Sequence, residues 1–144
     1  MELKKLRHKF SVCKVEDYSM VDFNQEFCFT SLLRLTKQMR RNVDFNQEFC
    51  FTGRTEEENS LVCMTEHVPE NATERDDGWR AFRIQGILDF SLIGILARIA
   101  GLLAQNEIGI FAVSTYNTDY ILTKEENYEK ALEILKQAGY QIID

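Results

Sequence analysis

Little in this sequence points to a membrane, a nucleic acid or a secreted protein. No apolar run in its 144 residues approaches the roughly 18 that a membrane-spanning helix needs. The first ten residues lack the apolar stretch of a signal peptide. Basic residues number 17 against 23 acidic ones, so the net charge is −6 and no nucleic-acid partner is expected. One proline and seven glycines argue against a disordered or linker-rich chain. We therefore expect a cytoplasmic protein of one domain, or of two very small ones.

Residues suited to catalysis or metal binding are also scarce. The two histidines, His8 and His67, are isolated, and no CxxC pair occurs. The four cysteines lie among aromatic or β-branched neighbours, which is typical of reduced, buried thiols: Cys13, Cys28, Cys50 and Cys63. Two histidines give too little material for a Ser-His-Asp or Cys-His arrangement. We expect no catalytic residues, no metal site and no cofactor.

The chain does contain an internal repeat, in which one segment occurs twice with identical sequence. VDFNQEFCFT occupies residues 21–30 and again residues 43–52. Removing 22 residues, either 21–42 or 31–52, leaves the same joined sequence. A solenoid would need about three imperfect units, so the repeat indicates a segment duplicated around an insert. The perfect identity of the two copies favours engineering over a natural tandem duplication.

The repeat gives two identical segments for one strand position. We expect residues 43–52 to form the native strand, because this keeps a tight hairpin short and lengthens only a loose connection. Such near-degeneracy would make the chain a candidate conformational switch. The insert, residues 31–42, has four basic residues, no acid and apolar residues at helical spacing. It predicts a helix that docks on its own protein, in preference to a membrane surface or a calmodulin-like partner.

The C-terminal half alternates between strand and helix patterns. Apolar alternation predicts four strands, over residues 79–86, 108–116, 120–123 and 140–143. Helical spacing predicts two amphipathic helices, over residues 92–106 and 125–138, and Gly139 ends the second. The resulting order is βαββαβ, the split unit of ferredoxin-like α+β domains.

The N-terminal half is less regular. Strands are expected over residues 10–15 and 61–65, and over residues 26–30 or their copy at 48–52. Residues 66–78 are polar and rich in turn formers, which predicts an exposed loop. This half has strands enough to complete a sheet but few helical signals outside the insert.

Residues 86–140 resemble an ACT domain, a regulatory module that binds amino acids. The resemblance is carried by Asp89 and Gly94 ahead of an apolar helix, by Ile-Gly-Ile at 108–110, and by the hairpin sequence STYNTDYIL at 114–122. That hairpin is similar to those of the ACT repeats in aspartate kinases and cytosolic arginine sensors. The segment between Asp89 and Gly94 is longer than in many ACT domains. Small bacterial ACT-domain proteins are the best match in length, and they imply a degenerate ACT-like half over residues 1–78 and an ACT domain over residues 79–144.

The resemblance also implies a ligand site for an amino-acid effector. Backbone N–H groups at the start of the first helix suit its carboxylate, and Asp89 or Asp119 suits its ammonium group. Each aspartate also has an ordinary structural role, Asp89 as a helix N-cap and Asp119 as a turn residue. The predicted ligand-binding residues are Leu88, Asp89, Phe90, Ser91, Ile93, Gly94, Val113, Ser114, Thr115, Asn117 and Asp119.

Two functions remain open at this point. The first is a non-catalytic sensor or regulatory module that binds a small molecule, an amino acid by resemblance, where ACT units meet. The second is a ligand-free interaction module that only forms dimers. The sequence does not decide which amino acid binds, or whether the protein is a monomer of two ACT-like halves or a homodimer.

Overall fold

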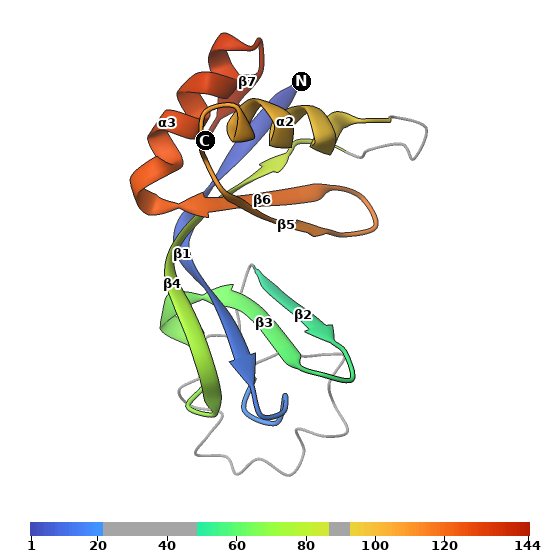
Figure 1. Cartoon of the computed structure of the whole chain (residues 1–144), viewed down its shortest axis with the longest axis vertical. Coiled ribbons are helices and arrows are strands. Elements are labelled where there is room, and N and C mark those ends of the chain that lie inside the picture. Colours follow the sequence, from blue (N-terminus) through green and yellow to red (C-terminus); the bar gives the residue numbers. More distant parts are fainter. Residues whose placement is uncertain (22–48, 87–92) are drawn as a thin grey trace. The chain divides into compact units, whose positions relative to one another are not determined.

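The structure is a computed structural model of the whole chain, and it describes residues 1–21, 49–86 and 93–144 (Figure 1). The elements in these ranges are β1 (Glu2–Val15), β2 (Cys50–Arg54), β3 (Asn59–Met64), a 3₁₀ turn (Thr65–His67), β4 (Ala72–Ile84), α2 (Ile95–Ala104), β5 (Ile110–Ser114), β6 (Asp119–Lys124), α3 (Glu125–Gln137) and β7 (Gln141–Ile143). No helix in the described ranges is long and apolar enough to span a membrane.

The chain forms two compact units, and one is inserted into the other along the sequence. The first unit combines Met1–Lys9 with Gly78–Asp144, and the second is Phe10–Asp77. Strands β1 and β4 each contribute residues to both units. One division lies between Asp77 and Gly78, and the expected domain boundary after residue 78 stays a prediction. The first nine residues, however, belong with the C-terminal half, because β1 pairs in parallel with β7 from Glu2↔Gln141 to Lys4↔Ile143.

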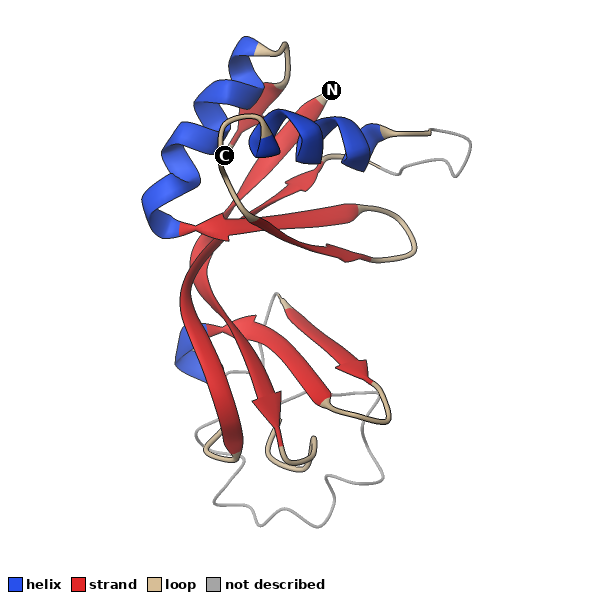
Figure 2. Ribbon diagram, in the orientation of Figure 1, coloured by secondary structure: helices blue, strands red, loops and turns tan. Residues whose placement is uncertain are grey.

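The first unit has the predicted βαββαβ order, β4-α2-β5-β6-α3-β7, in a mixed α+β fold. The strands of its sheet lie side by side in the order β7-β1-β4-β6-β5. β1 therefore lies between β4 and β7, which are the first and last strands of the βαββαβ unit. β6 pairs antiparallel with β4 from Trp79↔Lys124 to Arg83↔Tyr120, and with β5 from Ile110↔Thr123 to Ser114↔Asp119. Helices α2 and α3 lie on the same face of this sheet (Figure 2).

Both helices form because their apolar residues fall on one side. In α3 the buried residues are Tyr128, Ala131, Leu132 and Leu135, at the three- and four-residue spacing of a single helix face. Glu125 and Glu126 occupy its first turn, where negative charge is favourable. Gly139 follows the helix with φ +97°, a left-handed conformation that suits the glycine just after a helix. The predicted end of this helix is confirmed.

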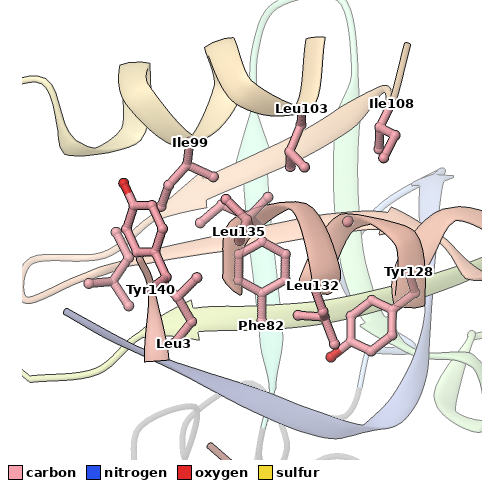
Figure 3. Packing of buried hydrophobic residues seen from close by; sticks show 12 residues of the cluster. Leu3, Phe82, Ile99, Leu103, Ile108, Tyr128, Leu132, Leu135 and Tyr140 are labelled. Atoms are coloured by element: carbon pink, nitrogen blue, oxygen red, sulfur yellow. The ribbon is translucent and has the colours of Figure 1, made fainter. Parts of the chain in front are cut away.

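The main hydrophobic core lies between these helices and the sheet (Figure 3). Phe82, Ile84 and Ile121 come from the strands and Ile99, Leu103 and Leu135 from the helices, and none of the six has exposed surface. Tyr128 packs in the same cluster and donates its hydroxyl hydrogen to the carbonyl of Ala81 at 2.9 Å. Burial raises the pKa of Tyr128 to about 12.

The second unit has a smaller core with two thiols in it. β3 pairs antiparallel with β1 on one side and β2 on the other. Cys13, Val15, Val21, Leu61 and Cys63 form the cluster. Cys50, which is partly exposed, lies opposite Cys63 in the β2–β3 register. Cys13 and Cys63 are free thiols.

Two expectations for strands and loops need correction. Residues 66–78 are not a continuous loop, because β4 begins at Ala72 and carries a run of charged residues. Those residues form a strand because their backbone pairs with the neighbouring strand β1. The Glu16 N–H donates to the Asn71 carbonyl at 3.2 Å, and Lys14 forms an ion pair with Glu74. β1 itself starts at Glu2 and not at residue 10, and its charged first half lacks the apolar alternation that identifies strands.

Helix α2 begins at Ile95, three residues after the predicted start at residue 92. Of the described residues of the second copy, Cys50, Phe51 and Thr52 open β2, and Phe49 precedes the strand. Most of the first copy and the whole insert at 31–42 lie outside the described residues. The preference for the second copy over the first, and the helix in the insert, therefore stay predictions.

Candidate functional site

A cavity of about 300 Å³ lies beside the β5–β6 hairpin of the first unit. Arg83, Gln85 and Gly86 line it from the end of β4. The hairpin contributes Thr115, Asn117, Thr118 and Tyr120. Its volume is at the lower end of the range for small-molecule sites, and most lining residues are polar.

Hydrogen bonds hold the hairpin loop in shape. The Thr115 N–H donates to the Thr118 carbonyl at 2.8 Å, and the Thr118 N–H donates to the Thr115 hydroxyl at 3.3 Å. The buried Thr118 hydroxyl donates to the carbonyl of Ile84 at 2.7 Å. This last bond ties the hairpin tip to the end of β4, so both walls of the cavity are fixed to each other.

Arg83 brings positive charge into the cavity. One terminal nitrogen of its guanidinium donates to Gln85 Oε1 at 3.3 Å, while its buried Nε has no hydrogen-bond partner among the described residues. The Gln85 N–H donates to the Glu2 carbonyl at 2.9 Å and holds this end of β4 against β1. A guanidinium with an unused buried N–H is suited to receive a carboxylate oxygen.

The approach to α2 has the features of a glycine-bearing helix start. Gly94 has φ +81°, which is left-handed and strained for any residue with a Cβ atom. Its carbonyl accepts the first helical bond, from the Arg98 N–H at 2.9 Å. Ile93 beside it is 94% exposed. The first N–H groups of α2 have no carbonyl partner within the helix, as at every helix start.

The predicted site residues take different places in the structure. Thr115 and Asn117 line the cavity. Ser114 and Asp119 face each other across the last pair of the hairpin, where the serine hydroxyl donates to Asp119 Oδ1 at 2.5 Å. Val113 is buried. Leu88, Asp89, Phe90 and Ser91 lie outside the described residues.

The sequence did not indicate five of the cavity residues as ligand contacts: Arg83, Gln85, Gly86, Thr118 and Tyr120. A signal was present, because Arg83 is a charged residue in an otherwise apolar stretch of strand, Ala81 to Ile84. Thr118 gives no such signal, because its bond to the Ile84 carbonyl joins residues that only tertiary packing brings together. Across residues 1–21, 49–86 and 93–144, no three His, Cys, Asp or Glu side chains converge as metal ligands.

Comparison with family models places the hairpin cavity in a known kind of module. Residues 74–137 match the model of the ACT domain family. The chain contains an ACT domain. The match runs from β4 through α3 and covers less than half of the 144 residues. It includes every described residue that lines the hairpin cavity.

Curated proteins similar to this chain include the cytosolic arginine sensor for mTORC1 subunit 1 of Homo sapiens and of Bos taurus. Each is 40% identical over 60 residues, which is 41% of this chain. The matched stretch makes up only 18% of the length of either relative. The similarity therefore concerns a short part of a much longer protein.

Solved structures resemble the chain over nearly its full length. A structural-genomics protein from Agrobacterium tumefaciens has a TM-score of 0.73 at 24% identity and covers 99% of this chain and 91% of its own. The regulatory subunit of aspartate kinase from Thermus thermophilus has a TM-score of 0.60 at 12% identity, with coverages of 96% and 97%. At these identities the likeness shows the fold alone.

Proposed function

We propose that this protein is a non-catalytic regulatory module that binds an amino acid at the hairpin cavity of its ACT domain. One observation carries the proposal: a cavity of about 300 Å³ with polar walls lies inside the segment that matches the ACT family. The names of its relatives support the ligand class, since one is an arginine sensor and another the regulatory subunit of an aspartate kinase. The cytosolic name of the first supports a cytoplasmic location.

Each charged end of a bound amino acid needs a partner of opposite charge or a hydrogen-bonding group. Arg83, with its unused Nε–H, is the proposed partner of the ligand carboxylate, together with the free N–H groups at the start of α2. Asp119 or Asp89 is the proposed partner of the ammonium group. Thr115 and Asn117 supply neutral hydrogen-bonding groups near the side chain of the ligand. The other predicted site residues, from Leu88 to Gly94 and at Val113 and Ser114, remain part of the proposal.

Calorimetry with each of the twenty amino acids tests the proposal directly. We expect one or a few to bind, and Arg83→Gln to weaken that binding by about 1 to 3 kcal/mol. Asp119→Ala and Asp89→Ala should separate the two candidates for the ammonium partner, with a loss of similar size in one of them. Arg54→Gln is the matched control, because Arg54 is an exposed arginine on β2 and outside the cavity.

The competing function is a ligand-free dimerisation module. It predicts that no amino acid shifts the unfolding midpoint or gives a binding isotherm, while analytical ultracentrifugation shows a stable homodimer. A monomer–dimer equilibrium that responds to a bound amino acid would instead join the two functions in one regulatory device. Unchanged affinity in all three site variants would show that the ligand binds elsewhere.

We also infer that the repeated segment is an engineered insertion and not a part of the ancestral fold. β2 and its hairpin to β3 need only the end of one copy, Cys50 to Thr52, followed by Gly53 and Arg54. A chain without residues 31–52 has that same sequence at the junction.

A further inference from the structure

A second cavity of about 380 Å³ opens in the first unit and shares no lining residue with the hairpin cavity. β1 contributes Lys5, Leu6 and Arg7 to its wall, and Arg80, Glu129 and Asp144 complete it. Three of these six residues are cations in a chain whose net charge is −6. We call it the basic pocket.

The two arginines of the basic pocket lie opposite each other on neighbouring strands. β1 and β4 are adjacent in the sheet, and backbone bonds mark both ends of their pairing: Glu16 N–H to Asn71, and Gln85 N–H to Glu2. The two residue numbers add up to the same sum in both bonds, so the register between the strands is the same at both ends. In that register Arg7 lies opposite Arg80. Like charges directly opposite on antiparallel strands are destabilising, so this arrangement needs a compensating negative charge.

The acidic residues of the pocket do not supply that charge in full. Asp144 forms an ion pair with Lys5, and this bond holds the pKa of the Asp144 carboxyl below its usual value, with a smaller contribution from Arg7. Among the described residues, neither Arg7 nor Arg80 forms an ion pair. Glu129 is the one further carboxylate in the pocket wall.

Arg80 is held in an orientation suited to ligand binding. Its guanidinium lies 4.7 Å from the centroid of the Tyr128 ring, a stacked arrangement that limits its freedom. The Tyr128 ring is itself fixed by the hydrogen bond to the Ala81 carbonyl. The Arg80 Nε atom is buried and has no hydrogen-bond partner in the described part of the chain. A buried donor without a partner is costly unless something else accepts its hydrogen.

We propose that the basic pocket binds a small anion that carries a carboxylate or phosphate group, with Arg7 and Arg80 as its two guanidinium partners. The planar fork of a guanidinium matches both groups, which accept two N–H bonds at once. The pocket volume fits a metabolite and not a macromolecule. The Glu129 carboxylate in the pocket wall repels a ligand of high negative charge. The pocket therefore favours an anion with one or two charges over a polyanion. This site is independent of the proposed amino-acid site.

An NMR titration of the full chain with inorganic phosphate and with succinate, at constant ionic strength, tests the proposal. We expect saturable shifts of the backbone amides around Arg7, Arg80 and Glu129 with at least one of the two anions. Phosphate and succinate distinguish the phosphate from the carboxylate class. Arg80→Gln and Arg7→Gln should each weaken binding by about tenfold or more, and Arg80→Lys should weaken it as well because the fork is lost.

Lys136→Gln is the control, because it removes one positive charge from an exposed position of α3 outside the pocket. Without any anion, Arg7→Gln should raise the unfolding midpoint, since it relieves the repulsion across the strands. This second readout also shows that the variant folds. The proposal is overturned if neither anion saturates at 20 mM, a concentration of roughly the scale that a weak millimolar site requires. It is equally overturned if Lys136→Gln reduces affinity as much as Arg80→Gln.

Discussion

The bond between the hairpin tip and β4 offers a sharp test of how the candidate site is held together. Thr118→Val replaces the hydroxyl with a methyl group of nearly the same size and keeps a β-branched side chain. It removes the 2.7 Å hydrogen bond to the Ile84 carbonyl and leaves that carbonyl buried without this partner. The bonds that the Thr118 carbonyl and N–H form with Thr115 do not depend on the substituted atoms.

The magnitude follows from burial. Thr118 is 7% exposed, so water does not readily replace the lost donor. Leaving a buried carbonyl unsatisfied costs about 1 to 3 kcal/mol, and we expect Thr118→Val to destabilise the protein by that amount. For a chain of this length the unfolding midpoint should fall by about 2 to 4 °C per kcal/mol. Affinity for an amino acid should also fall, because the same bond fixes the cavity wall.

Thr123 on β6 provides a matched control for the same substitution. Its side chain has no exposed surface, and its hydroxyl oxygen has no hydrogen-bond partner among the described residues. Thr123→Val therefore removes a buried polar group without breaking a bond, which should stabilise the protein by about 1 kcal/mol or more. Urea denaturation of both variants measures the difference in the free energy of unfolding.

The two variants should thus move stability in opposite directions. If Thr118→Val and Thr123→Val change the free energy of unfolding equally, the hydrogen bond to Ile84 is not what secures the hairpin. A stable Thr118→Val variant with unchanged ligand affinity would refute both the energetic argument and the link to the cavity.

Three further predictions concern the core, the thiols and the repeat. The pKa of Tyr128 is raised from 10.0 to about 12 in the folded state. The free energy of unfolding should therefore be constant below pH 10 with respect to this group and fall as the pH rises to 12. Tyr128→Phe should remove that dependence when denaturation is measured at a series of pH values. The hydrogen bond to Cys13 and burial raise the pKa of Cys63, so in thiol labelling of the native protein Cys63 should react after Cys50, and simultaneous labelling would contradict this. Deleting residues 31–52 should leave a folded chain whose unfolding midpoint is equal or higher, by circular dichroism, since loop length changes closure entropy by only about 0.6 kcal/mol per doubling. A deleted chain that fails to fold would contradict the view that the segment is an addition.

The local patterns of the C-terminal half were enough to predict its elements. Tyr128, Ala131 and Leu135 recur at helical spacing, and Gly139 follows them, so the helix and its end can be read without knowing what they pack against. The charged segments were misread for the converse reason. Residues 2–9 form a strand because they pair with the end of β4 and, at Glu2–Lys4, with β7. Residues 72–77 form a strand because they pair with the second half of β1, and side-chain patterns do not record such partners.

The candidate sites divide in the same way. The hairpin residues Thr115 and Asn117 were predicted from sequence similarity alone, since the turn that holds them is continuous in the chain. Arg83 enters that cavity only because Thr118 ties the hairpin to the end of β4, a contact between residues 34 positions apart. The pairing of Arg7 with Arg80 depends on strands still farther apart in sequence. Helix periods, caps and turns are local and were determined by the sequence itself, whereas strand partners, the inserted unit and both cavities were decided by long-range pairing in the tertiary structure.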